Sequence, residues 1–123
     1  MSDYEDDMME TLNRRLGTTY GGLVAVCANL PVPITLPQGV VTNTEIIPAV
    51  RRVADISDEQ PMPEDQHAQL FTGSVLWLTA ADAFQLLIKE GYVESRAAGA
   101  LGVLMIANDA LTDLGGWLLE QMS

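Results

Sequence analysis

Cysteine, histidine and basic side chains are scarce in this 123-residue sequence, and each scarcity excludes a class of protein. Cys27 is the only cysteine, so neither an intrachain disulfide nor a cysteine-based zinc site can form. Its apolar neighbours predict a buried thiol with a raised pKa. His67 is the only histidine, and because no nucleophile or orienting group marks it as a catalytic base, we expect it to face solvent. This cysteine usage is typical of a reducing compartment, and we expect a cytoplasmic location.

Basic side chains are few, since six Lys and Arg stand against 17 Asp and Glu, for a formal net charge of -11. Binding to the phosphates of nucleic acids or to anionic membrane surfaces requires clustered Lys and Arg. We therefore expect no direct nucleic-acid binding and no membrane association. The charge favours a protein partner with a basic face. One alternative function is thus an acidic mimic of nucleic acid that blocks the basic groove of a nucleic-acid-processing enzyme.

Long uninterrupted apolar runs are also missing. A transmembrane helix needs about 20 consecutive apolar residues. The apolar region after Ala97 is interrupted by Asp109 and Asp113, and the region after Tyr20 by prolines at positions 31, 33 and 37. The acidic start of the chain is the opposite of the basic start of a secretory peptide. We expect neither a membrane span nor a targeting signal.

Helical patterns dominate what is present. We predict one mainly α domain over residues 1–123, with an acidic N-terminal helix at 1–17, an uncharged arm at 18–44 and a helical body at 45–123. The prolines of the arm force extended backbone, so the arm is predicted to be irregular, with possible short β segments. It could fold over its own core or lie on a neighbouring subunit. Candidate interface residues in it are Pro33, Ile34 and Leu36.

The segment 97–107, AAGALGVLMIA, looks helical yet is apolar all round. A helix without a polar face is normally enclosed, by a larger structure or by another chain. Glycine in a helix costs up to about 1 kcal/mol relative to alanine, so Gly99 and Gly102 predict a compensating close approach of another backbone, within the chain or from a second one. The candidate interface residues in this region are Gly99, Leu101, Gly102, Met105 and Trp117.

Two pairs of carboxylates stand one helical turn apart, Asp6 with Glu10 and Asp109 with Asp113. In all-helical nucleotide pyrophosphatases, pairs of this kind hold Mg²⁺ between helices. Here no basic residue accompanies either pair to bind phosphate, and solvated helix faces explain both. We therefore expect no metal and no cofactor. A Mg²⁺-dependent helical nucleotide hydrolase remains the third candidate function.

No catalytic motif is visible in the sequence, so we expect a non-enzymatic protein. The apolar helix and the uncharged arm favour a protein–protein interaction or assembly protein that binds a protein partner, forms a homo-oligomer, or both. Small acidic proteins of this composition are common among virus- or phage-encoded assembly factors and inhibitors of host machinery. This is an analogy of size and composition, not a family resemblance.

Overall fold

The computed structural model describes residues 2–39 and 42–122. It contains four α-helices and one short 3₁₀ turn, and no strand occurs in these two ranges. The elements are α1 (Asp3–Ala28), α2 (Asn43–Ile56), η1 (Ser57–Glu59), α3 (Glu64–Glu90) and α4 (Glu94–Met122). The prediction of a mainly α protein is confirmed, whereas the predicted short β segments are not supported.

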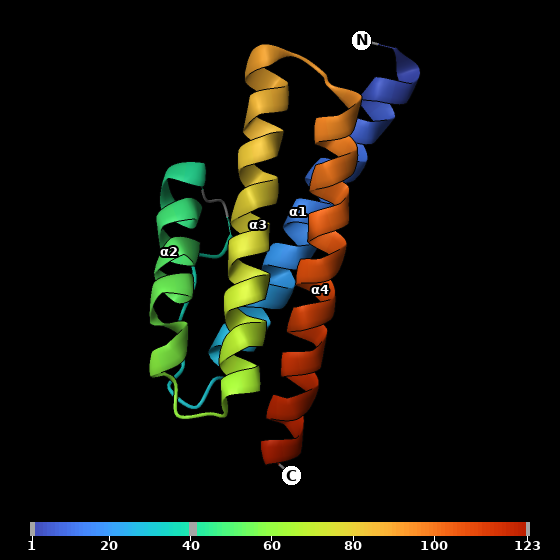
Figure 1. Ribbon diagram of the computed structural model, residues 1–123. Helices are drawn as coiled ribbons and strands as arrows, with labels where there is room; N and C mark the ends of the chain where they lie inside the picture. The colour runs from blue at the N-terminus through green and yellow to red at the C-terminus, as the bar shows by residue number, and fades with distance from the viewer. Residues whose placement is uncertain (1, 40–41, 123) are drawn as a thin grey trace.

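The two longest helices, α3 and α4, form an antiparallel hairpin, and α1 packs against both of them (Figure 1). The green helix α2 lies on the far side of α3 and makes no contact with α4 in the described part of the chain. One long side of α4 is therefore covered by no other element.

Helix α1 begins at a conventional cap, because the Ser2 hydroxyl accepts a hydrogen bond from the backbone N–H of Glu5 at 3.2 Å. It then continues well past Gly17, where we predicted its end. A single glycine costs about 1 kcal/mol in a helix interior. Burial of Leu23, Val26 and Cys27 on the next turns exceeds that cost, since each apolar side chain contributes about 1.5–3 kcal/mol.

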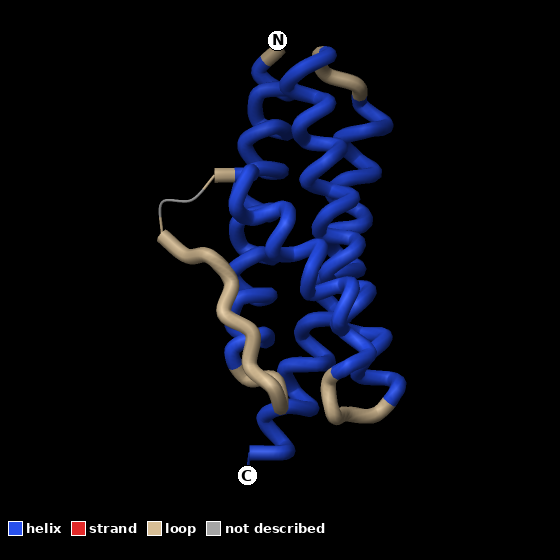
Figure 2. The backbone as a smooth tube through the Cα atoms, turned by 90° about the vertical axis from the view of Figure 1, so that its left-hand side faces the viewer, coloured by secondary structure: helices blue, strands red, loops and turns tan. Residues whose placement is uncertain are grey.

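The extended arm predicted for 18–44 is not supported, because residues 18–28 belong to α1 and Asn43 and Thr44 belong to α2. Its second part, from Asn29 to Gly39, is an irregular connection that folds back along the helices (Figure 2). The Gln60 side chain holds it by accepting from the Val32 N–H at 2.9 Å and donating to the Val32 carbonyl at 2.7 Å. The Tyr20 hydroxyl donates to the Pro37 carbonyl at 2.6 Å. Residues 40 and 41 of the predicted arm lie outside the described residues.

Helix α3 is continuous, although Thr79 with Asp82 three residues later resembles a capping box, which would begin a new helix. The Thr79 hydroxyl donates instead to the carbonyl of Val75, one turn back, at 3.0 Å. Its neighbour Trp77 is only 4% exposed and donates its indole N–H to the Leu16 carbonyl on α1 at 3.0 Å. This bond joins the centre of the hairpin to α1.

Gly73 sets how closely the two hairpin helices approach. A Cβ built on Gly73 would lie 2.6 Å from Cδ2 of Leu111 on α4, well inside van der Waals contact. Gly73 itself is buried and Leu111 is 3% exposed. The absence of a side chain at position 73 therefore lets Leu111 fill the space between α3 and α4.

Candidate functional site

Only one side of α4 is buried. Ala97, Ala100, Leu104 and Ala107 face α1 and α3, at exposures of 0 to 3%. On the opposite side, Met105 is 60% exposed and Ile106 is 55% exposed. The helix that is apolar all round is thus only half covered by its own chain. We call the uncovered side, made of Ala98, Gly99, Gly102, Met105 and Ile106, the outer face of α4.

The two glycines of the outer face have open space where a side chain would stand. A Cβ built on Gly99 or on Gly102 would meet no other atom within 4 Å, apart from the helix's own backbone and nearest neighbours. Packing inside the subunit therefore does not require glycine at either position. This differs from Gly73, where the same operation produces a clash with Leu111.

The outer face carries no charge. No Asp, Glu, Lys or Arg occurs from Ala97 to Asn108, in a chain of net charge -11. Exposed Asp109 borders the face toward the C-terminus of α4. At the other end, Arg96 lies 3.8 Å from Glu90 in a partly exposed ion pair. An uncharged apolar surface on an acidic protein is a candidate contact site.

The other predicted interface residues have varied positions. Leu101 and Trp117 are partly buried and pack against the core. Pro33 is exposed and Ile34 is half-buried, but Leu36 is 2% exposed and belongs to the core of its own chain. Of the predicted set, the structure brings together Gly99, Gly102 and Met105. Ile106 was missed, although it stands one turn after Gly102.

Cys27 and His67 have structural surroundings. Burial raises the pKa of the Cys27 thiol to about 12, in agreement with the sequence prediction, so the thiol stays protonated at neutral pH. His67 does not simply face solvent, as we expected. It is partly buried, and its Nε2 lies 2.6 Å from the Gln60 carbonyl oxygen, which requires the proton on Nε2. Gln60 in turn holds the Val32 backbone, so His67 supports the connection between α1 and α2.

The carboxylates do not form a metal site in the described residues. Nowhere in residues 2–39 and 42–122 do three Asp, Glu, His or Cys side chains come close enough together to hold a metal ion. The Mg²⁺-dependent hydrolase therefore receives no support from the arrangement of the described carboxylates.

Helices α3 and α4 are each long and apolar enough to cross a membrane, judged by length and composition alone. In each of them, 33% of the residues in the most apolar 18-residue window are buried inside the chain. The core helices of soluble proteins pass the same test, so this finding does not distinguish lipid from protein as the cover of the exposed apolar surface. It does show that both helices carry more apolar surface than the chain itself encloses.

Comparison with known proteins gives no further guide. The chain matches no family model, no curated protein and no solved structure.

Proposed function

We propose that this protein is a non-enzymatic interaction protein that self-associates through the outer face of α4, with a second copy of the chain as the occupant. The observation that carries the proposal is the pair of glycines, Gly99 and Gly102, which no contact inside the chain uses. Each costs up to about 1 kcal/mol of helix stability. A helix backbone from another subunit, seated against them, would provide the compensating contact.

A second copy fits the outer face because it supplies an equally flat and uncharged surface. Isologous packing around a twofold axis would bury Met105 and Ile106 of both copies, which are 60% and 55% exposed in the single chain. Each fully buried side chain of this size contributes about 1.5–3 kcal/mol. The small residues beside them allow the two helix backbones to approach closely, as small residues do in transmembrane helix pairs.

The charges at the two ends of the outer face favour an antiparallel pair. Seven residues make about two helical turns, so in an antiparallel pair centred on Gly102 residue 109 of one copy lies opposite residue 95 of the other. Asp109 of one copy would then lie beside Ser95 and Arg96 of the other, a hydroxyl and a cation. In a parallel pair the two Asp109 carboxylates would face each other and repel.

The salt dependence separates this proposal from the acidic-mimic alternative. Two copies that each carry a formal charge of -11 repel at long range, and salt screens that repulsion. Self-association through an uncharged face should therefore strengthen as salt is added. Binding of an acidic mimic to a basic groove should weaken under the same change.

The experiment is sedimentation velocity of the wild type and of Gly102→Leu over a range of protein concentrations. We expect the wild type to dimerise, and Gly102→Leu to raise the dimer Kd at least tenfold, which corresponds to about 1.4 kcal/mol. Gly21→Leu is the matched control, because Gly21 is also an exposed helical glycine with nothing within 4 Å but lies on α1. Its Kd should equal that of the wild type.

Three results would overturn the proposal. The first is a wild type that stays monomeric at every concentration. The second is an equal loss of association in Gly102→Leu and Gly21→Leu. The third is flotation of the wild type with neutral phosphatidylcholine vesicles together with burial of the outer face in lipid, seen as protection of Met105 from aqueous oxidants. That outcome would assign the apolar surface of α3 and α4 to a membrane.

A further inference from the structure

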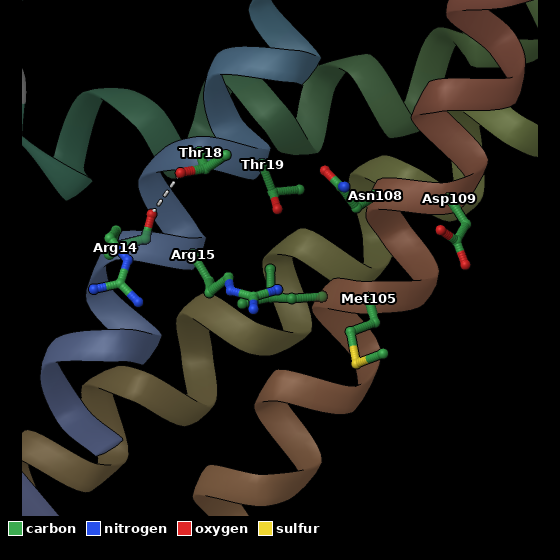
Figure 3. Close-up of a pocket in the computed structure, with 8 residues that line it drawn as sticks. Arg14, Arg15, Thr18, Thr19, Met105, Asn108 and Asp109 are labelled. Carbon is green, nitrogen blue, oxygen red and sulfur yellow. Dashed lines mark hydrogen bonds between the residues drawn. The ribbon is translucent and has the colours of Figure 1, made fainter. Parts of the chain in front are cut away.

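A cleft of about 370 Å³ lies between the middle of α1 and the middle of α4, beside the outer face (Figure 3). Leu104 and Met105 supply apolar parts of its wall. Its polar lining comes from both helices and consists of Arg14, Arg15, Thr18, Thr19, Asn108 and Asp109. This is an unusual gathering of donors, because the chain holds only six Lys and Arg.

The two arginines have no carboxylate partner within the chain. In the described residues no Asp or Glu oxygen lies within 4.0 Å of the guanidinium of Arg14 or Arg15, and the one ion pair found there joins Arg96 to Glu90. Arg15 reaches from α1 toward α4 across the cleft (Figure 3). Arg15, a cation without a counterion at the cleft, is a suitable site for an oxyanion, which a guanidinium group binds through paired N–H donors. Arg14 lines the same cleft, with its guanidinium turned away from α4 (Figure 3).

Thr19 provides an independent indication of a ligand. Thr19 is only 3% exposed as a residue, and its hydroxyl makes no hydrogen bond within the described residues. Hydroxyls inside helices usually donate to the carbonyl four residues back, as Thr18 does to Arg14 at 3.0 Å. Thr19 does not, and its hydroxyl points into the cleft (Figure 3). The hydroxyl atom itself is open to the cleft, so it is free to donate to, or accept from, a ligand bound there.

Asn108 and Asp109 further restrict the chemical class of ligand that fits the cleft. The Asn108 amide points toward Thr19 from the α4 side, which adds a donor and an acceptor (Figure 3). Asp109 places a carboxylate at the same cleft. A bare anion would be repelled by it, whereas a hydroxyl or ammonium group on the ligand would donate to it.

We propose that this cleft binds a small organic oxyanion, a carboxylate or a phosphate ester, that also carries a hydroxyl or ammonium group. Arg15 binds the oxyanion, Thr19 and Asn108 orient it, and Asp109 accepts from the donor group of the ligand. Every lining residue comes from one chain, so the cleft is complete in a single copy, and Met105 and Asp109 are shared with the proposed contact between copies.

The test is an NMR titration of the ¹⁵N-labelled protein with three probes: O-phosphoserine, L-serine and inorganic phosphate. We expect O-phosphoserine to give saturable shifts confined to the residues around Thr19 and Asn108, with weaker binding of inorganic phosphate. If L-serine binds as tightly as O-phosphoserine, the carboxylate is the recognised oxyanion. If L-serine binds much more weakly, the phosphate ester is.

Two variants and one control make the assignment specific. Arg15→Gln should weaken O-phosphoserine binding about tenfold, whereas Arg52→Gln, an equal change of charge at an exposed site on α2, should leave it unchanged. Thr19→Val should weaken binding about fivefold while leaving the free energy of unfolding about unchanged, because no hydrogen bond within the described residues depends on the Thr19 hydroxyl.

The proposal is overturned if the shifts spread over the whole surface without saturating, or if Arg15→Gln and Arg52→Gln weaken binding equally. It is also overturned if Thr19→Val binds like the wild type. Equal affinity for inorganic phosphate and O-phosphoserine would remove the role given to Asp109 and the requirement for a donor group.

Discussion

Gly73 and Gly102 are the same residue type on two helices of one hairpin, yet their surroundings are opposite. Gly73 lies inside the α3–α4 contact, where a Cβ would sit 2.6 Å from Leu111. Gly102 lies on the outer face of α4, where a Cβ would meet nothing within 4 Å. The first glycine is explained by the chain itself, and the second is not. This difference locates the surface on which we propose that another molecule seats.

The difference between the two glycines is tested most directly by a substitution at Gly73. Gly73→Ala inserts a methyl group against Leu111, and overpacking of a core costs about 1–3 kcal/mol, against which better helix propensity returns up to about 1 kcal/mol. We expect a net loss in the free energy of unfolding, measured by urea denaturation. Unchanged or raised stability would show that position 73 tolerates a side chain and that the two glycines do not differ.

A double-mutant cycle with Leu111→Ala sharpens this first prediction. Leu111→Ala alone should cost about 2–5 kcal/mol, because it leaves a cavity. Since the new methyl group at position 73 fills part of that cavity, the double variant should be more stable than the sum of the single effects, by at least about 0.5 kcal/mol. Strict additivity would contradict the close contact of Gly73 with Leu111.

The second prediction acts on the outer face. Ile106 is 55% exposed, so Ile106→Asp should change the free energy of unfolding of the monomer by no more than about 0.5 kcal/mol. In the proposed pair it places a carboxylate in the apolar contact, and we expect the dimer Kd to rise at least tenfold in sedimentation equilibrium. Val32→Asp is a matched control, since Val32 is 57% exposed and lies outside α4. An equal rise in the dimer Kd for both variants would show that the two copies do not meet specifically at the outer face.

Much of this fold was predictable because helical periodicity and capping act over a few residues. The mainly α class and the buried thiol of Cys27 both followed from local pattern. The extended arm was wrong for a tertiary reason: burial of Leu23 and Val26 carries α1 past Gly17, and Gln60, 28 residues away, holds the Val32 backbone. Likewise, the sequence marks Gly73, Gly99 and Gly102 alike. Only the packing separates the glycine that has a neighbour in the chain from those that do not.

The cleft between α1 and α4 could not be predicted from the sequence. Arg15 and Asn108 stand far apart in the chain, and no motif links them. Thr19 was assigned to the arm and not to a helix, so nothing indicated that its side chain would line a cleft beside α4. A site built from two helices becomes visible only once their relative placement is known.

The third expected effect is smaller, and it is stabilising for the monomer but destabilising for the dimer. Gly99→Ala should raise the free energy of unfolding of the monomer by up to about 1 kcal/mol, because alanine is the better helix former and nothing crowds it. In the dimer the same methyl group should hold the two backbones apart and weaken association. Gly21→Ala is the control that should stabilise without weakening association. A variant at position 99 that stabilises both states would show that no close backbone contact forms there.

The smallest effect is expected at the exposed end of the hairpin, where the Tyr4 and Tyr92 hydroxyls donate to Glu94 at 2.7 Å and 2.5 Å. These two bonds lower the pKa of Glu94, so they add stability above the carboxyl's unfolded pKa, and that contribution is lost as pH falls through its lowered folded pKa. The bond from Tyr4 to Glu94 also raises the pKa of Tyr4, so the stability that this bond contributes is lost as pH rises past the ordinary tyrosine pKa.

Tyr4→Phe should therefore speed amide exchange in the first turns of α1 at neutral pH and make no difference once Glu94 is protonated. An exchange difference that persists in acid would assign the anchoring of α1 to the aromatic ring rather than to the hydroxyl. Either result measures how much stability an exposed contact within the chain contributes. Effects of substitutions at Gly99 or Gly102 can then be compared with that contribution.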